Sequence, residues 1–206
     1  SEEFGCPVVS DFRIRDMAAG GLGAPLVPYT EFLLYRSETD DVALQNIGGI
    51  GNITLLPAGC SLEDVTAFDT GPGNMVMDAL ASRITGGKLG YDDGGKLAAS
   101  GKVIPALLSR MLEDPYLAKQ PPKTTGREYY GAAYVEKLVS FGDYPLEDIL
   151  ATATRFTAES IALSLHRFAR RMPARLVVGG GGSRNPTLLR LLADALPECR
   201  VQTQED

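Results

Sequence analysis

Residues 43–56, Ala-Leu-Gln-Asn-Ile-Gly-Gly-Ile-Gly-Asn-Ile-Thr-Leu-Leu, place two short apolar runs on either side of a Gly-Gly pair. Such a pair supplies a tight turn, because glycine adopts backbone angles that other residues avoid. We therefore predict that residues 43–47 and 52–56 form a β-hairpin. A third predicted strand, 65–69, follows the hairpin and ends on the carboxylate of Asp69, just before the Thr-Gly-Pro-Gly run.

Beyond this hairpin, helical and strand-like patterns alternate along the chain. We predict helices from Asn74 to the glycines at 86 and 87, and over 103–112, 146–172 and 186–196; strands over 175–179 and from 200 onward; and loops over 88–101 and 121–128. This alternation indicates an α/β fold, with a mixed sheet and helices packed against it. Since no internal repeat or linker divides the chain, residues 1–206 are expected to form a single domain.

The chain carries 26 acidic and 20 basic residues, a formal net charge of −6. This balance argues against nucleic-acid binding, which needs a basic surface to displace counterions. No apolar run approaches the ~20 residues that span a bilayer, and the first residues lack a signal-peptide pattern, so no membrane association is expected. Three dispersed cysteines, without metal-ligand spacing, favour a reduced cytoplasmic setting and no protein-held metal.

Asp69 is the candidate for acid–base chemistry. Its place at a predicted strand end, beside two glycines, leaves space around the carboxylate. The helix that follows at Asn74 favours an ionised carboxylate, which can accept a proton from a hydroxyl or a water. The plainer alternative is that Asp69 caps this helix, but Asn74 itself is better placed to do so. Asp78, further along the helix, is interpreted as a structural or supporting residue.

Two glycine-rich segments could bring backbone N–H groups close to a phosphate. The first is 46–52, for which a plain hairpin turn is the simpler interpretation. The second is 178–186, Val-Gly-Gly-Gly-Gly-Ser-Arg-Asn-Pro, in which Asn185 suits a helix cap and Pro186 the first helical position. It matches neither the dinucleotide fingerprint nor the P-loop, which has a lysine after its glycines. Four glycines between a buried strand and a capped helix fit a flexible turn and a ligand site equally well.

Two further segments carry basic residues suited to an anion. In 10–16 a strand-like alternation would put Arg13 and Arg15 on one side, although a solvated ion-pair cluster explains the pattern equally well. Residues 122–128, Pro-Lys-Thr-Thr-Gly-Arg-Glu, predict a basic loop that could hold an anion or be an ordinary surface loop. The one histidine, His166, lies on the long predicted helix and is interpreted as a surface or boundary residue.

In order and in spacing, these segments resemble the anhydro-N-acetylmuramic acid kinase family. The matching stretches are 9–28, 46–52, 68–78, 122–128 and 178–186, and the resemblance extends over essentially the whole chain. It implies one lobe of the actin/hexokinase/Hsp70-like ATPase fold, a ribonuclease H-like mixed sheet with flanking helices. It also implies that residues 1–206 are most of the C-terminal lobe of a two-lobe sugar kinase, without the N-terminal lobe and the extreme C-terminus.

The family phosphorylates the 6-oxygen of 1,6-anhydro-N-acetylmuramic acid with ATP while water opens the anhydro ring, in cell-wall sugar recycling. The resemblance implies that Asp69 activates the water and that Arg15, with Asp69, binds the sugar. The ATP-binding residues that it implies are Gly48, Gly49, Asn52, Gly180, Gly181, Gly182 and Asn185. Mg²⁺ would arrive with ATP rather than in a protein site. The implied partners are therefore an amino sugar and ATP, with a homodimer as the implied assembly.

Two features depart from the family pattern. The family's Gly-rich N-terminal phosphate segment has no counterpart here, and the sequence breaks off just after its last predicted strand. Because one wall of the cleft would then be missing, we expect this chain alone to be nearly inactive. Ile14 stands where the family usually has a basic residue, which weakens the expectation of sugar contacts there. The alternatives are another sugar or acetate kinase of the same fold and a non-catalytic, nucleotide-binding regulatory module.

Overall fold

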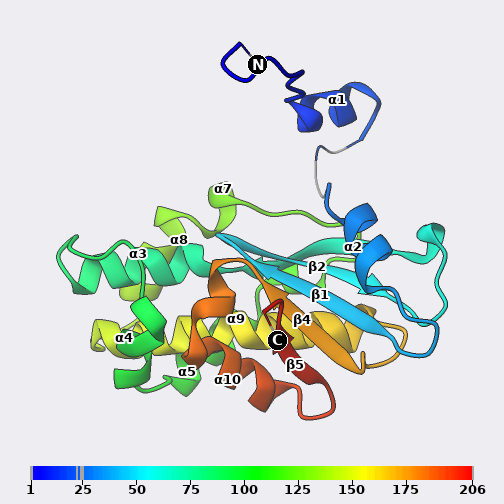
Figure 1. Cartoon of the computed structure of the whole chain (residues 1–206). Coiled ribbons are helices and arrows are strands. Elements are labelled where there is room, and N and C mark those ends of the chain that lie inside the picture. The colour runs from blue at the N-terminus through cyan, green and yellow to red at the C-terminus, as the bar shows by residue number, and fades with distance from the viewer. Residues whose placement is uncertain (1, 22, 24–25, 206) are drawn as a thin grey trace.

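The computed structural model describes residues 2–21, 23 and 26–205, which form a five-stranded sheet with helices packed against it (Figure 1). The strands are β1 (Val42–Ile47), β2 (Ile50–Leu56), β3 (Thr66–Pro72), β4 (Arg175–Gly179) and β5 (Arg200–Thr203), in the order β3-β2-β1-β4-β5. The helices are α1 (Phe12–Ala18), α2 (Pro28–Tyr35), α3 (Asn74–Ile84), α4 (Lys96–Ser100), α5 (Pro105–Leu112), α6 (Pro115–Ala118), α7 (Arg127–Tyr130), α8 (Ala132–Val139), α9 (Leu146–Phe168) and α10 (Pro186–Ala195).

Two kinds of strand pairing meet at β1. β1 and β2 form the predicted hairpin, in which Ile47 lies opposite Gly51. β3 continues antiparallel beside β2, whereas β4 runs parallel to β1 and β5 parallel to β4. A parallel strand needs a crossover connection, and the segment between β3 and β4 carries α3 to α9. The predicted mixed sheet with flanking helices is confirmed, and its strand order is that of the ribonuclease H-like sheet.

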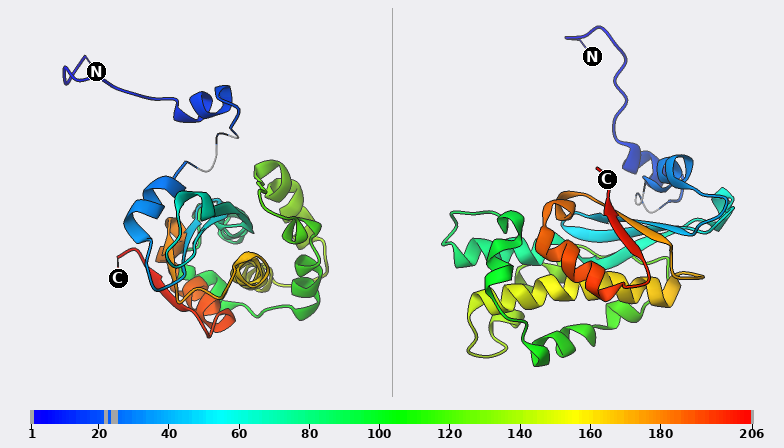
Figure 2. Two further views of the ribbon diagram at one scale, coloured as in Figure 1. Left: turned by 90° about the vertical axis from the view of Figure 1, so that its right-hand side faces the viewer. Right: turned by 60° about the horizontal axis from the view of Figure 1, so that its bottom comes forward.

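The two faces of the sheet are covered by different helices. The main core lies between the sheet and α9, which is buried along most of its length and runs beneath the strands (Figure 2). Ala43 and Ile47 of β1 belong to this core, while Val42 and Leu44 pack with α2 in a smaller cluster. Alternate residues of a strand point to opposite faces, which explains the division. With both faces covered, a ligand site is expected at the strand ends and loops.

α9 buries hydroxyl groups as well as apolar side chains. Thr152, Thr154 and Ser164 each donate a hydrogen bond to the carbonyl four residues earlier, at 2.7–2.8 Å. Because these local bonds satisfy the hydroxyls, they can lie in an apolar layer without an unpaired polar atom. The predicted helix is confirmed, although it ends at Phe168 rather than at Met172.

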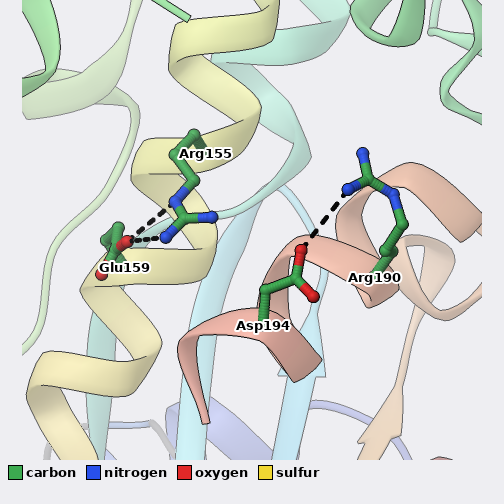
Figure 3. Close-up of polar contacts among 4 residues, drawn as sticks. All are labelled: Arg155, Glu159, Arg190 and Asp194. Atoms are coloured by element: carbon green, nitrogen blue, oxygen red, sulfur yellow. Dashed lines mark hydrogen bonds and ion pairs between the residues drawn. The ribbon is translucent and has the colours of Figure 1, made fainter. Parts of the chain in front are cut away.

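Ion pairs spaced four residues apart lie on α9 and on α10 (Figure 3). Arg155 Nε donates to Glu159 Oε1 at 2.7 Å, and about a quarter of each side chain is exposed (26% and 24%). Arg190 Nη1 lies 3.4 Å from Asp194 Oδ2, and these side chains are 64% and 53% exposed. Since exposed pairs contribute little, only the first pair is expected to support its helix noticeably.

Three predictions about the scaffold are wrong. Residues 88–101 are not a plain loop, because a 3₁₀ turn (Asp93–Gly95) leads into α4, and the Asp92 carboxylate accepts from the N–H groups at its start. β3 does not end at Asp69 but continues to Pro72, paired with β2. Asn74 does not cap α3: it is the first helical residue, and its Nδ2 donates to the Ile47 carbonyl at 3.0 Å.

The strand-like interpretation of residues 10–16 is also wrong, because these residues lead into α1. Figure 1 shows α1 standing away from the sheet, and none of its residues is buried. Residues two apart on a helix do not share a face, so Arg13 and Arg15 do not lie side by side. Ser1, Leu22, Ala24, Pro25 and Asp206, three of which belong to the 9–28 motif, lie outside the described residues.

Candidate active site

Asp69 lies in β3 beside a cavity of about 300 Å³. Its cross-strand partner on β2 is Asn52, at an irregularity in the pairing of the two strands. Other polar residues that line this cavity are Arg13, Glu31, Asn46, Lys123, Thr124 and Gln204. Polar side chains that converge on a concave space from separate parts of the chain are typical of a ligand site.

Three hydrogen bonds hold Asp69 in place. Its carboxylate Oδ2 accepts from the Thr125 N–H at 2.9 Å, and its own N–H donates to the Lys123 carbonyl at 3.0 Å. The Tyr116 hydroxyl donates to the Asp69 carbonyl at 2.9 Å. β3 is thereby tied to the basic loop at 121–126, so two segments that are separate candidates in the sequence belong to one site. None of the three bonds uses Asp69 Oδ1.

The environment of Asp69 changes its acidity. Burial raises the pKa of its carboxyl, and the bond from the Thr125 N–H and the Lys123 ammonium partly counteract this rise. A general base works best when its pKa lies near the working pH, so a raised carboxyl pKa suits that role. The geometry therefore gives Asp69 both an orientation and an acidity that proton transfer can use.

Arg13, rather than Arg15, lines the cavity beside Asp69. Arg13 Nη1 also donates to the Gly23 carbonyl at 2.7 Å. Arg15 lines a different hollow, between α1 and α2, together with Phe12 and Thr30. The structure therefore does not bring Arg15 and Asp69 together, and sugar binding by Arg15 stays a prediction.

Two charged residues of the Asp69 cavity were not assigned to it from the sequence. Glu31 comes from α2, where burial raises its carboxyl pKa and a hydrogen bond with Thr54 lowers it. Lys123 is only 5% exposed, and burial lowers the pKa of its ammonium to about 8. The basic character of the 122–128 loop was a signal for Lys123. Nothing in the spacing of α2 residues distinguishes Glu31 from an ordinary helix carboxylate.

The Gly48-Gly49 turn packs against the start of α3. The Gly48 carbonyl accepts from the Asn74 N–H at 2.7 Å, and the Gly49 carbonyl accepts from the N–H groups of Gly73 and Met75 at 3.0 and 3.1 Å. These bonds use the N–H groups that a helix start would offer to an anion. In a trans peptide the C=O and the following N–H point in opposite directions, so the Gly49 N–H points away from α3. The turn, rather than the helix start, keeps an N–H group for a phosphate.

The glycine run after β4 leads through a 3₁₀ turn, Gly181–Arg184, into α10. As predicted, Asn185 caps this helix, because its side chain accepts from the Leu188 N–H at 3.0 Å, and Pro186 is the first helical residue. Gly182 is buried against Ile47, whose Cγ2 would lie 2.5 Å from a Cβ at that position. A Cβ at Gly180 would lie 2.5 Å from Asn46 Oδ1 and 2.8 Å from the Ile47 carbonyl oxygen, so packing requires glycine at 180 and at 182, whereas Gly181 has more room.

Three cavities adjoin in a row along these segments. The Asp69 cavity shares Gln204 with a cavity of about 350 Å³ beside the glycine run. That cavity shares Gly181 and Arg184 with a third, of about 450 Å³, which Asn185 also lines. Asp69 therefore lies at one end of the row and the capped start of α10 at the other. Adjoining spaces of this kind can hold two substrates close enough for a group to pass between them.

Asp78 lies on α3 and lines the third cavity. Burial raises the pKa of its carboxyl to about 6. Of the two sequence-based interpretations of Asp78, as a structural or as a supporting residue, the supporting one fits a position beside the site better. The structure places it on a cavity wall, where a ligand can reach it.

In the described part of the chain, no group of three or more His, Cys, Asp or Glu side chains is arranged to hold a metal ion. Over the same residues, no helix has the length and apolar character needed to cross a membrane. His166 is exposed near the end of α9 and lines none of the three cavities.

Comparison with known proteins points to one family. The family model of anhydro-N-acetylmuramic acid kinase matches residues 1–206. The anhydro-N-acetylmuramic acid kinase of Caldanaerobacter subterraneus is 52% identical, over 100% of this chain and 53% of that protein. The one from Clostridioides difficile is 44% identical, over 97% of this chain and 52% of that protein. The solved structure of a xylulose kinase from Rhodospirillum rubrum matches at 14% identity and a TM-score of 0.47, over 79% of this chain and 34% of that one. The chain spans about half the length of the curated relatives it matches.

Proposed function

The chain belongs to the anhydro-N-acetylmuramic acid kinase family, and from this premise we propose that it carries the active site of an ATP-dependent kinase. The reaction converts 1,6-anhydro-N-acetylmuramic acid to N-acetylmuramic acid 6-phosphate. The row of adjoining cavities is the observation that carries the proposal. In this arrangement the sugar occupies the end with Asp69, and the nucleotide occupies the end with Asn185.

Asp69 acts as the base for the water that opens the anhydro ring. Water forms a bond to C1 and gives a proton to the Asp69 carboxylate, the bond from C1 to the bridging oxygen breaks, and the released 6-oxygen takes the γ-phosphoryl group of ATP. The products are the sugar 6-phosphate and ADP, with the water proton on Asp69. The raised pKa of the carboxyl and its bond from the Thr125 N–H support this role, since both favour directed proton transfer near neutral pH.

Arg13 and Glu31 are the proposed sugar contacts beside Asp69. A guanidinium suits the lactyl carboxylate of muramic acid, and a partly buried carboxylate can accept a hydrogen bond from a sugar hydroxyl or from the acetamido N–H. Both side chains line the Asp69 cavity, as does Asn52. The proposal therefore assigns to Arg13 the contact expected of Arg15, and places Asn52 at the sugar rather than at ATP.

The glycine segments approach the phosphates of ATP. Backbone N–H groups stabilise the charge that develops in phosphoryl transfer without a basic side chain, which fits Gly49, Gly180 and Gly181. Asn185 and Asp78 line the outermost cavity, where the nucleoside would lie. Mg²⁺ is proposed to bind through the phosphates of ATP, since kinase sites hold this ion with few protein ligands.

Turnover by a whole enzyme is itself part of the proposal, because the chain spans about half the length of its relatives. Residues 1–206 are proposed to form most of the C-terminal lobe, with a second wall of the cleft supplied by the rest of the enzyme. This chain alone should therefore turn over little substrate. A cytoplasmic location, where ATP is available, and a homodimeric assembly belong to the same proposal.

The test compares this chain, the complete Caldanaerobacter subterraneus relative, and an exchanged enzyme in which this chain replaces the matching half of that relative. Each protein is mixed with ATP, Mg²⁺ and 1,6-anhydro-N-acetylmuramic acid, and the sugar phosphate is measured. We expect turnover by the relative and by the exchanged enzyme, and little by this chain alone. An exchanged enzyme that folds and binds ATP but leaves the sugar unchanged would favour another sugar or acetate kinase, or a regulatory nucleotide-binding module.

A further inference from the structure

Lys123 is a buried cation that the proposed reaction does not use. Its Nζ lies 4.8 Å from the ring centre of Tyr116, 4.9 Å from that of Phe168 and 5.5 Å from that of Phe68. It also donates to the carbonyls of Tyr116 and Leu117, at 3.4 and 3.3 Å. These three rings and two carbonyls form a cage around an ammonium that is almost closed off from solvent, since the residue is 5% exposed.

The cage by itself does not explain the charge. An apolar side chain would fill a space between aromatic rings without the cost of removing an ion from water. Burial, with Arg167 and Lys119, lowers the pKa of Lys123, and among the described residues Asp69 is the carboxylate that acts in the opposite direction. Lys123 belongs to none of the ion pairs formed among the described residues. Asp69 is thus the carboxylate whose charge favours the ionised form of Lys123.

Lys123 and Asp69 are also joined through the backbone. The Asp69 N–H donates to the Lys123 carbonyl at 3.0 Å, and two residues further along the Thr125 N–H donates to Asp69 Oδ2 at 2.9 Å. The backbone between these two bonds is short, so the position of Lys123 determines where the Thr125 N–H points. The cage thus anchors the loop at the place where it meets the carboxylate.

We propose that Lys123 is a positioning residue for Asp69, because its caged ammonium fixes the loop that brings the Thr125 N–H to the carboxylate and keeps that carboxylate ionised. The inference rests on the proposed role of Asp69 as a base, but the coupling between the two side chains can be measured without the kinase reaction. The other charged or titratable groups around Asp69 are Arg13 on α1, Glu31 on α2 and the Tyr116 hydroxyl on α6. The variants below leave all three in place.

The first test measures the pKa of the Asp69 carboxyl by carbon-13 NMR in this chain. Lys123→Met fills the cage without a charge, and Lys123→Arg keeps the charge. Lys119→Met is the matched control, because Lys119 is exposed and its Nζ lies 5.7 Å from the centre of the same Tyr116 ring. We expect a higher Asp69 pKa in Lys123→Met, a smaller rise in Lys123→Arg and no change in Lys119→Met. A folded Lys123→Met chain with an unchanged Asp69 pKa overturns the proposal, whatever its melting temperature.

The unmodified chain provides a second test if Lys123→Met does not fold. The Thr125 amide resonance should shift once as Asp69 titrates and again near pH 8 as Lys123 loses its proton. A Thr125 resonance that shows only the Asp69 transition contradicts the coupling. Neither NMR test depends on sugar phosphorylation, so a failure of the proposed function and a failure of this inference are distinguishable.

In the exchanged enzyme, the same coupling should appear in the kinetics. Lys123→Met should lower kcat roughly tenfold with little change in the KM for sugar, since less of the Asp69 carboxylate is ionised and the Thr125 N–H orients it less well, while the sugar contacts remain. The acidic limb of the pH–rate profile should move to higher pH, because a base with a higher pKa is ionised only at higher pH. A purely structural role would lower the amount of active enzyme and leave the pH profile in place.

Discussion

Asp69 and Asp78 lie at opposite ends of the row of cavities, and their surroundings differ. Both carboxyls are partly buried. Asp69 accepts a hydrogen bond from the Thr125 N–H, and this bond and the charge of the Lys123 ammonium both oppose the rise in its pKa. At Asp78 burial raises the pKa to about 6, and none of the described residues opposes this rise.

This difference shows how one fold prepares two carboxyls for different uses. A donor to the charged form and a nearby cation keep a buried carboxylate ionised, which a base requires. A carboxyl without them is ionised at neutral pH only at a cost in stability. The Asp69 end is therefore organised for proton transfer, whereas the Asp78 end carries a charge that works against folding until a ligand or a proton neutralises it.

The largest effect is expected when the base is removed. In the exchanged enzyme, Asp69→Asn should lower kcat by about 10²-fold or more while ATP binding persists, since general-base catalysis contributes about 10²–10⁴-fold. Asp78→Asn should act mainly on the KM for ATP. Initial rates at varied sugar and ATP, with ATP binding by calorimetry, check both. Equal losses of kcat in the two variants would contradict the proposal that Asp69 acts in proton transfer and Asp78 in ATP binding.

A smaller effect is expected at the glycine run that separates the two ends. A Cβ at Gly182 would lie 2.5 Å from Ile47 Cγ2, whereas one at Gly181 would lie 3.3 Å from Asn74 Nδ2. Overpacking costs about 1–3 kcal/mol, so Gly182→Ala should lower the free energy of unfolding by that amount and Gly181→Ala by clearly less. Urea titration of both chains measures the difference. If the Gly182→Ala chain were as stable as the parent, β1 would be able to move aside at Ile47 at little cost in free energy.

The charge of Asp78 should give a pH-dependent effect. Its pKa rises from 3.8 to about 6 on folding, so the folded state binds a proton more tightly than the unfolded state does. The stability that this proton contributes is fully present below pH 3.8 and is lost as the pH rises through 6. Asp78→Asn cannot ionise and should be more stable than the parent at pH 7.5, by about 1 kcal/mol after allowance for partial exposure. Unfolding at pH 4 should show no such gain. If the gain in stability were the same at both pH values, its cause would be the amide group and not the loss of the charge.

The smallest effects are expected where charges pair in water rather than in a cavity. Arg190→Ala should change the free energy of unfolding by less than about 0.5 kcal/mol, because the pair with Asp194 is largely exposed. Arg155→Ala should cost more, up to roughly 1 kcal/mol, because its pair with Glu159 is mostly covered. Thermal unfolding of the two variants at low and high salt compares them. A larger loss for Arg190→Ala would reverse the expected dependence on burial.

Features that depend on residues close together in the sequence were predictable from the sequence. The hairpin at 43–56 and the start of α10 at Asn185 and Pro186 follow from turn and capping preferences within a few residues. The long apolar period over 146–172 likewise predicted the helix α9. The strand predicted from the alternating charges at 10–16 was wrong, because the chain there forms α1. In a short exposed segment such an alternation does not distinguish a strand from a helix.

By itself the sequence determined the strands, the main helices, the family and the candidate base. Only the tertiary structure decided what surrounds that base: the Thr125 N–H reaches Asp69 across 56 positions of chain, and Glu31 and Gln204 arrive from elements without a recognisable motif. It also decided that Arg13, and not Arg15, lies beside Asp69. The physical reason is that local patterns encode turns and helix starts, whereas strand order and packing bring together residues that the chain keeps far apart.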